Sequence, residues 1–315
     1  MPKIALILMC ALVLMGLVFA ALQPRPVRAF ARRCLSSHPP GRVHPNPLPT
    51  GTNNSPVVIF WAWERPEDFR FLTPGQAAVA FLAKTIYLQP PATDSSGATA
   101  LSFLVRPRLQ PLRIAPGTPL IAAVRIEMGA APRVLSVAQP LAPSFRSVSY
   151  SATRSDRLAS EIADLQSIPG ISAIQIDFDA PASAHPFYAT LLQEVRRKLP
   201  DSFPLSITAL ASWCIGDPWL AQLPPNTIDE AVPMLFRMGP AAGDVVKFLH
   251  SGNDFPVAAC QFSLGLSTDE PLLKNLLSSK SLPNAVTRHD KRVYVFAPRS
   301  WSQSDADEIL KELHP

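Results

Sequence analysis

Apolar runs alternate with amphipathic stretches from residue 57 to the end of the chain. Continuous runs rich in Val, Ile, Leu and Phe predict buried strands, and apolar residues at helical spacing between them predict helices. The predicted strands are 57–64, 86–88, 120–128, 172–180, 205–213, 231–238, 257–266 and 292–297. The predicted helices are 75–84, 155–167, 186–199, a short one from about 217, 241–250, 271–278 and 304–313. Eight strands separated mostly by helices indicate an α/β fold, a single (β/α)8 TIM-like barrel.

The pattern is irregular around the second strand and helix. No amphipathic helix is visible between residues 88 and 120, where residues 99–108 instead predict an extra strand or hairpin. An open doubly wound sheet is the alternative fold. We favour the barrel because no glycine-rich nucleotide-binding turn follows any of the predicted strands.

The chain divides into three predicted parts: residues 1–22, 23–56 and 57–315. Residues 4–22 form an uncharged apolar run that is long enough for a transmembrane helix or an export signal. Residues 23–56 are rich in proline and arginine and read as a linker. We expect an exported protein, periplasmic or anchored in the cytoplasmic membrane and facing outward, although the arginines after the run oppose that orientation.

Charge and cysteine content narrow the function classes. Six of the 29 basic residues and none of the 24 acidic residues precede residue 57, so the predicted domain is nearly neutral. The domain therefore lacks the basic surface that nucleic-acid binding requires. It contains Cys214 and Cys260, which we expect as two buried thiols; a disulfide after export is the alternative.

Polar residues recur at the carboxyl ends of the predicted strands, where barrel active sites are built. Alternation along 172–180 places Asp177 and Asp179 on the side of the strand that faces the barrel interior. Mutual repulsion of two carboxylates can keep one of them protonated, which is the state a general acid needs. The other candidates that share this edge are Glu64, Glu127, Trp61, Trp63, Arg125, Gln175, Trp213, Arg237, Gln261 and Trp301.

Each candidate also has a structural interpretation. The two aspartates could simply pair with Arg125 or Arg237, and at least two of the four tryptophans are better explained as core or rim packing. His185 beside the aspartates is a weak indication of a metal site. The sequence contains no nucleotide, flavin or zinc-protease motif, and we expect no cofactor.

Several segments of this chain resemble uncharacterised bacterial proteins grouped as domain of unknown function 3142. They are FWAWERPEDFRFL, LVRPRLQPLRI, LIAAVRIE, IQIDFDAPAS, LSITALASWCIGDPWL and DEAVPMLFRMG, and together they span nearly the whole predicted domain. The resemblance implies an exported or membrane-associated protein. More distantly, Gln175-x-Asp177-x-Asp179 is similar to the D-x-D-x-E strand of chitinase-type glycoside hydrolases. That similarity implies that Asp179 donates the proton, with Gln175 in place of the first aspartate.

Two functions remain open from the sequence. The first is a glycoside hydrolase-like enzyme acting on an envelope or extracellular glycan, with Asp179 as acid, Asp177 tuning it, and Glu127 or Glu64 as base or nucleophile. The second is a non-catalytic glycan-binding or envelope-assembly protein on the same barrel. A carbohydrate is the expected ligand, and the membrane is a partner only if residues 1–22 are retained. A metal-assisted hydrolase using Asp177, Asp179 and His185 is a weaker third reading.

Overall fold

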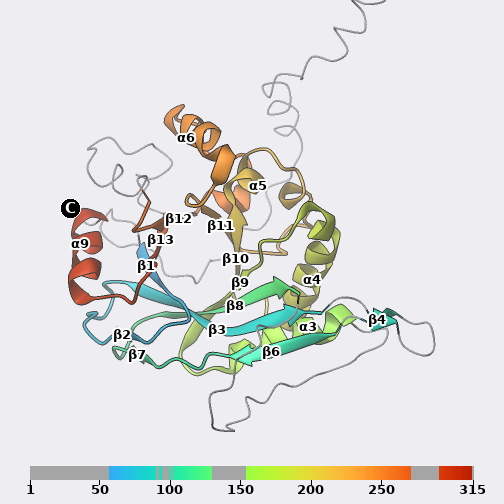
Figure 1. The fold of residues 1–315 in the computed structure, drawn as a ribbon, viewed down its shortest axis with the longest axis horizontal. Helices are drawn as coiled ribbons and strands as arrows, with labels where there is room; N and C mark the ends of the chain where they lie inside the picture. Colours follow the sequence, from blue (N-terminus) through green and yellow to red (C-terminus); the bar gives the residue numbers. More distant parts are fainter. Residues whose placement is uncertain are drawn as a thin grey trace, which may run out of the picture. The chain divides into compact units, whose positions relative to one another are not determined.

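A closed barrel of eight parallel strands forms the centre of this chain. The computed structural model describes residues 57–89, 92–93, 99–100, 102–129, 154–270 and 291–313. Strand β1 pairs with both β13 and β3, which closes the ring β1-β13-β12-β11-β10-β9-β8-β3 and confirms the predicted barrel (Figure 1). The barrel strands are β1 (Val57–Ala62), β3 (Ala78–Leu88), β8 (Leu120–Met128), β9 (Ile171–Asp177), β10 (Leu205–Leu210), β11 (Glu230–Met234), β12 (Ser263–Ser267) and β13 (Arg292–Phe296).

Helices follow most of these strands. The α-helices are α3 (Arg154–Ala163), α4 (His185–Lys198), α5 (Ala211–Ile215), α6 (Ala242–His250) and α9 (Gln303–Leu313). The 3-10 turns are η1 (Asp164–Ser167), η2 (Ala182–Ala184), η3 (Leu220–Gln222), η4 (Gly239–Ala241) and η5 (Ala258–Cys260). The helices predicted at 155–167, 186–199, 241–250 and 304–313 are therefore confirmed. Where a short helix is predicted from about 217, the structure has the 3-10 turn η3, and α5 replaces the end of the predicted strand 205–213.

The prediction of a helix at residues 75–84 is wrong. Residues 78–82 are instead the first half of β3, and all five are buried. A strand covered on both faces needs apolar side chains at successive positions, and a short apolar run of this kind does not distinguish strand from helix. The connection from β1 to β3 contains β2 (Glu67–Phe69), which pairs with β7 (Leu112–Ile114).

The extra strand predicted within 99–108 is confirmed. It comprises β5 (Thr99–Ala100), which pairs with β4 (Ala92–Thr93), and β6 (Phe103–Pro107), which runs antiparallel to β3. One edge of β3 pairs with β8 along its whole length, so β1 and β6 share the other edge. Where β1 ends, the guanidinium of Arg108 donates hydrogen bonds to the carbonyl oxygens of Ala62, Trp63 and Arg65. This contact satisfies backbone groups that leave the sheet.

A buried polar network fills the barrel interior near the amino-terminal ends of the strands. Glu230, the first residue of β11, accepts hydrogen bonds from Arg292 Nε (2.6 Å), the Tyr294 hydroxyl (2.8 Å) and the Ser206 hydroxyl (2.8 Å). Gln175 donates to the Ser206 hydroxyl. Trp61, which closes this network, donates its indole N–H to Gln175 at 2.7 Å. These side chains point inward from β1, β9, β10, β11 and β13 and therefore link five of the eight barrel strands.

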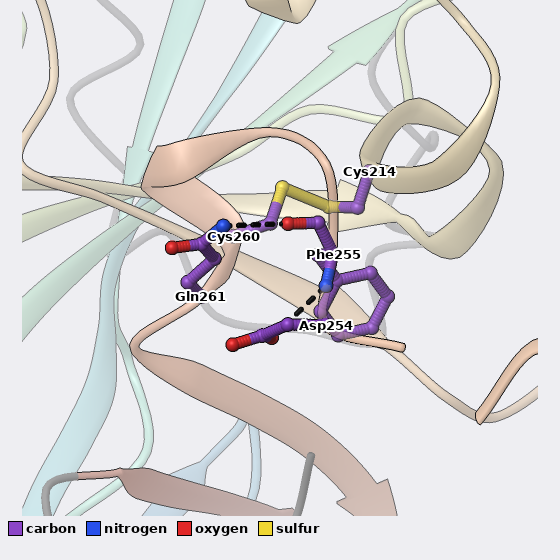
Figure 2. Close-up of a disulfide and its surroundings, with 5 residues drawn as sticks. All are labelled: Cys214, Asp254, Phe255, Cys260 and Gln261. Atoms are coloured by element: carbon purple, nitrogen blue, oxygen red, sulfur yellow. Dashed lines mark hydrogen bonds between the residues drawn. A yellow bond between two sulfur atoms is a disulfide. The ribbon is translucent and has the colours of Figure 1, made fainter. Parts of the chain in front are cut away.

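Cys214 and Cys260 form a disulfide, not the pair of free thiols that we expected (Figure 2). The bridge joins α5 to η5 across 46 residues of sequence, and their Cα atoms are 5.8 Å apart. Sequence spacing did not reveal this pairing because β11 and α6 separate α5 from η5 along the chain, and only the tertiary structure brings the two cysteines together. The chain-entropy account gives such a bridge a stabilisation of about 4 kcal/mol.

Three predicted segments, 4–22, 23–56 and 271–278, lie outside the residues that the structure describes. Among the helices within the described ranges, none is long and apolar enough to cross a membrane.

Candidate active site

Acidic side chains converge at the carboxyl ends of β8 and β9. Arg125 and Glu127 point inward from β8, and Arg125 pairs in register with Asp177 of β9. Arg125 Nε lies 2.9 Å from Glu127 Oε1 and 3.9 Å from Asp177 Oδ2. Asp179 follows two residues beyond the end of β9. We call this group (Arg125, Glu127, Asp177 and Asp179) the acidic side of the rim.

The pKa of Asp177 is raised to about 6. Burial is the largest cause because it disfavours the anion, and the negative charge of Asp179 adds to it. A hydrogen bond from the Thr208 hydroxyl (2.7 Å) and the charge of Arg125 act in the opposite direction. Asp179 is more exposed, but loss of solvent still raises the pKa of its carboxyl, and Arg125 opposes this shift. The sequence suggested repulsion as the cause, whereas burial dominates for both groups.

Glu64 has a different environment. It lies two residues beyond the end of β1 and forms an ion pair with Arg106 of β6. The Arg106 guanidinium also lies over the ring of Tyr87, 5.8 Å from its centroid. Tyr87 in turn is the register partner of Glu127 on the neighbouring strand. Glu64 is therefore charge-compensated, whereas the carboxylates around Asp177 share a single arginine.

Aromatic residues occupy the opposite part of the rim. Phe296 ends β13, Trp63 directly follows β1 and Phe236 lies two residues beyond β11; all three are partly exposed. Phe236 and Phe296 stack with ring planes 7° apart and centroids 5.9 Å apart. Trp63 meets Phe296 edge-on at 6.4 Å, and the Arg237 guanidinium lies 5.4 Å from the Phe296 centroid. We call these four residues the aromatic side of the rim.

The other three candidate tryptophans are buried, which confirms that at least two of the four serve packing. Trp61 fills the barrel interior, where the nearest Trp61 atom is 2.9 Å from the place that a Cβ on Gly265 would occupy. Trp301 donates its indole N–H to the carbonyl oxygen of Trp61, and its backbone N–H donates to buried Glu67. Trp213 packs edge-on against His185 and Trp219. In these positions none of the three presents a ring face to the rim.

Two polar candidates, Gln261 and Gln175, lie elsewhere than the sequence suggested, and a third, Arg237, has a different partner. Gln261 precedes β12, at the amino-terminal end of the barrel, because the strand begins only at Ser263; its amide donates to the carbonyl oxygen of Phe255 (Figure 2). Gln175 is fully buried in the interior network. Arg237 is exposed and lies 3.3 Å from Asp269, so the suggested pairing of Arg237 with Asp177 or Asp179 is wrong.

His185 begins α4 and stacks on Trp219 with centroids 4.7 Å apart. Its Nδ1 lies 4.0 Å from Asp217, not beside Asp177 and Asp179. Within the described residues, no three His, Cys, Asp or Glu side chains are grouped to hold a metal ion.

Several residues of the rim were missed from the sequence. They are Thr208, Tyr87, Arg106, Phe236, Phe296 and Asp269. Phe236, Phe296 and Thr208 share the inward parity of their strands, so alternation counted back from a correct strand end would have found them. Arg106 carries no such signal, because β6 belongs to no barrel repeat.

No family model matches this chain, so its resemblance to domain of unknown function 3142 stays a prediction. No curated protein matches it either. Among solved structures, the chain is similar to a putative chitinase A from Streptomyces coelicolor, with 9% identity, a TM-score of 0.46, and coverage of 83% of this chain and 98% of that one. It is also similar to the chitinase domain of the spore coat protein CotE from Clostridium difficile, with 14% identity, a TM-score of 0.32, and coverage of 81% and 68%.

Proposed function

We propose that this chain is a glycoside hydrolase-like enzyme that acts on an envelope or extracellular glycan. The observation that carries the proposal is the raised pKa of Asp177, about 6, next to a second carboxyl whose pKa is also raised. A carboxyl that keeps its proton near neutral pH can protonate the oxygen of a leaving group. The partly exposed aromatic side of the same rim supports a sugar as the ligand.

The roles follow from exposure and charge. Asp179 is the more exposed of the two aspartates and acts as proton donor. Asp177 is the neighbouring carboxyl that adjusts the pKa of the pair. Glu127 acts as base or nucleophile, because it shares Arg125 with Asp177, whereas Glu64 pairs with Arg106. Glu127 and Asp177 both approach one nitrogen of Arg125, so their nearest oxygens are at most about 7 Å apart.

Release of reducing ends from a panel of β-linked oligosaccharides and bacterial polysaccharides tests this function. We expect hydrolysis by the full chain, and a loss of about 100-fold or more in Asp179→Asn and in Asp177→Asn. Asp201→Asn, which removes a carboxylate from an exposed turn after α4, is the matched control and should leave hydrolysis unchanged. Activity should fall as the pH rises and the two aspartates lose their protons, and chelator should have no effect.

Binding of a glycan without turnover would instead support the second candidate, a non-catalytic glycan-binding or envelope-assembly protein. The partly exposed rings of Trp63, Phe236 and Phe296 favour this alternative, because stacking on sugar faces needs no acid pair. In that case Trp63→Ala would weaken binding and Asp179→Asn would not.

We also propose that the protein is exported, either periplasmic or anchored in the cytoplasmic membrane and facing outward. The apolar run at residues 4–22 and the disulfide between Cys214 and Cys260 support this location, because disulfides persist in oxidising compartments. A reporter fused to the carboxyl terminus should be active only outside the cytoplasmic membrane. A cytoplasmic signal would refute the location.

A further inference from the structure

The aromatic side of the rim contains a polar residue, Arg237, that the proposed hydrolysis does not use. Arg237 follows β11 with a φ of 53°, a left-handed conformation that non-glycine residues adopt rarely and that marks functional positions. Its guanidinium lies over the ring of Phe296, and the Arg237 side chain is 57% exposed. Contact with an aromatic ring restricts a guanidinium before any ligand arrives.

Asp269 completes this arrangement from the neighbouring strand end. Its carboxylate lies 3.3 Å from Arg237 Nη2 and accepts a hydrogen bond from the hydroxyl of Ser267. Arg237 and Asp269 therefore present an N–H donor and a carboxylate acceptor side by side, next to the partly exposed rings of Trp63 and Phe296. Because Asp269 balances the charge of Arg237, the pair suits adjacent hydroxyl groups better than a ligand with its own net charge.

We propose that Trp63, Phe296, Arg237 and Asp269 form a subsite for a neutral pyranose unit, separate from the unit that reacts at Asp179. Trp63 takes the apolar C–H face of the ring, Phe296 holds the guanidinium of Arg237, Arg237 donates to one hydroxyl, and Asp269 accepts from its neighbour. The inference rests on the proposed function only in that both concern one glycan.

The barrel order fixes how far apart the two units are bound. Strand β13, which ends in Phe296, is four strands from β9 in either direction around the ring, so the two sides face each other across the rim. Eight strands spaced about 4.8 Å apart give a rim roughly 12–15 Å across. That distance exceeds one sugar ring, so the ligand is an oligosaccharide and a monosaccharide reaches only one side.

Isothermal titration calorimetry with a chain-length series tests the subsite. The probes are β-1,4-linked glucose and N-acetylglucosamine oligomers, from the monosaccharide to the hexasaccharide. The protein is the full chain carrying Asp177→Asn, which leaves the probes intact, in a polyoxyethylene detergent that contains no sugar. We expect affinity to rise with chain length. Trp63→Ala and Arg237→Asn should each lower hexasaccharide affinity about tenfold and leave monosaccharide affinity unchanged; asparagine tolerates the left-handed backbone at position 237.

Matched variants at the other end of the barrel serve as controls. Phe262→Ala removes an exposed ring just before β12, and Arg197→Asn removes an exposed arginine that pairs with Glu194 at 3.4 Å. Both should bind every probe as the parent does, and Trp63→Phe should recover most of the affinity that Trp63→Ala loses. Melting temperatures of all variants verify that they are folded.

Three results would overturn the subsite: no binding of any oligosaccharide, an equal loss at every chain length, or unchanged hexasaccharide affinity in both Trp63→Ala and Arg237→Asn. If the chain with Asp177 intact hydrolyses nothing but binding still depends on length and on Trp63, the proposed hydrolysis fails and the subsite stands. If the chain hydrolyses glycans and the two variants bind normally, the subsite alone fails.

Discussion

The barrel interior holds acidic side chains at two levels, and their surroundings differ. Near the amino ends of the strands, Glu230 accepts hydrogen bonds from Arg292, Tyr294 and Ser206 and is completely buried. At the carboxyl ends, Asp177 accepts one hydrogen bond, from Thr208, and Arg125 approaches only to 3.9 Å. Asp179 and Glu127 add negative charge there.

This difference separates a structural charge from a candidate reactive one. Glu230 forms a close ion pair with Arg292, so its charge is held by a partner that also links β11 to β13 across the interior. Asp177 is buried beside other acids, so its proton is retained to higher pH. A carboxylate deep in the barrel is thus a poor indicator of function unless its partners fail to compensate it.

The largest loss of stability is expected from breaking the ion pair between Glu230 and Arg292. Arg292→Met leaves the carboxylate of Glu230 buried without its cation, which should cost about 3–5 kcal/mol in the free energy of unfolding. Urea unfolding of the purified chain measures this loss, with Arg197→Met as a control on an exposed arginine. A loss below about 1 kcal/mol would mean that the network is not the structural centre that we infer.

Asp177, at the carboxyl ends of the strands, should behave in the opposite way. The pKa of Asp177 is about 6 in the folded chain, against 3.8 for an unperturbed aspartate, so the folded state binds the proton more tightly. The contribution of Asp177 to stability should therefore be greatest below about pH 4 and fall as the pH rises to about 6, by an amount on the order of 3 kcal/mol.

Replacement of Asp177 by Asn should remove most of this pH dependence and raise stability at pH 7. Urea unfolding at a series of pH values measures it, and Asp201→Asn should retain the slope of the parent chain. A variant that is less stable than the parent at pH 7 would contradict the inference that the fold disfavours the charged form of Asp177.

A smaller loss is expected at Gly265, which lies between the two levels. A Cβ there would come within 2.9 Å of Trp61 and 3.3 Å of the carbonyl oxygen of Pro233. Gly265→Ala should cost about 1–3 kcal/mol through overpacking and disturb the hydrogen bond from Trp61 to Gln175. Urea unfolding together with the fluorescence of the buried tryptophans measures both effects, and Gly243→Ala, where a Cβ meets no atom within 4 Å, is the control.

The smallest change in stability should come from Asp179→Asn. Asp179 is exposed, and no ion pair with another described residue holds its carboxylate, so we expect a change of about 0.5 kcal/mol or less. Hydrolysis should nevertheless fall by about 100-fold or more. A thermal melt beside the activity assay distinguishes this from a structural role, in which removal of the charge would cost several kcal/mol.

Much of this architecture was readable from the sequence. The strand at 120–128 matches β8 residue for residue, and the helices at 186–199 and 304–313 differ from α4 and α9 by one residue at most. Alternation along 172–180 also placed Asp177 and Asp179 at the correct edge of the barrel. These features depend on local periodicity, which short stretches of sequence carry by themselves.

The sequence was less informative where long-range contacts decide. It could not show that 78–82 pairs with β1 and β8 as a strand, that Trp61 and Gln175 belong to a buried network, or that Gln261 precedes its strand. It also could not select Arg106, from an added strand, as the partner of Glu64.

The sequence by itself thus determined the order of most elements and the edge at which acidic residues collect, because side-chain periodicity is local. Only the tertiary structure decided which acids are compensated and which are not. The pKa of Asp177 depends on burial by β8, β9 and β10 and on charges up to 52 residues away in sequence, such as Arg125, and only closure of the barrel brings those groups together.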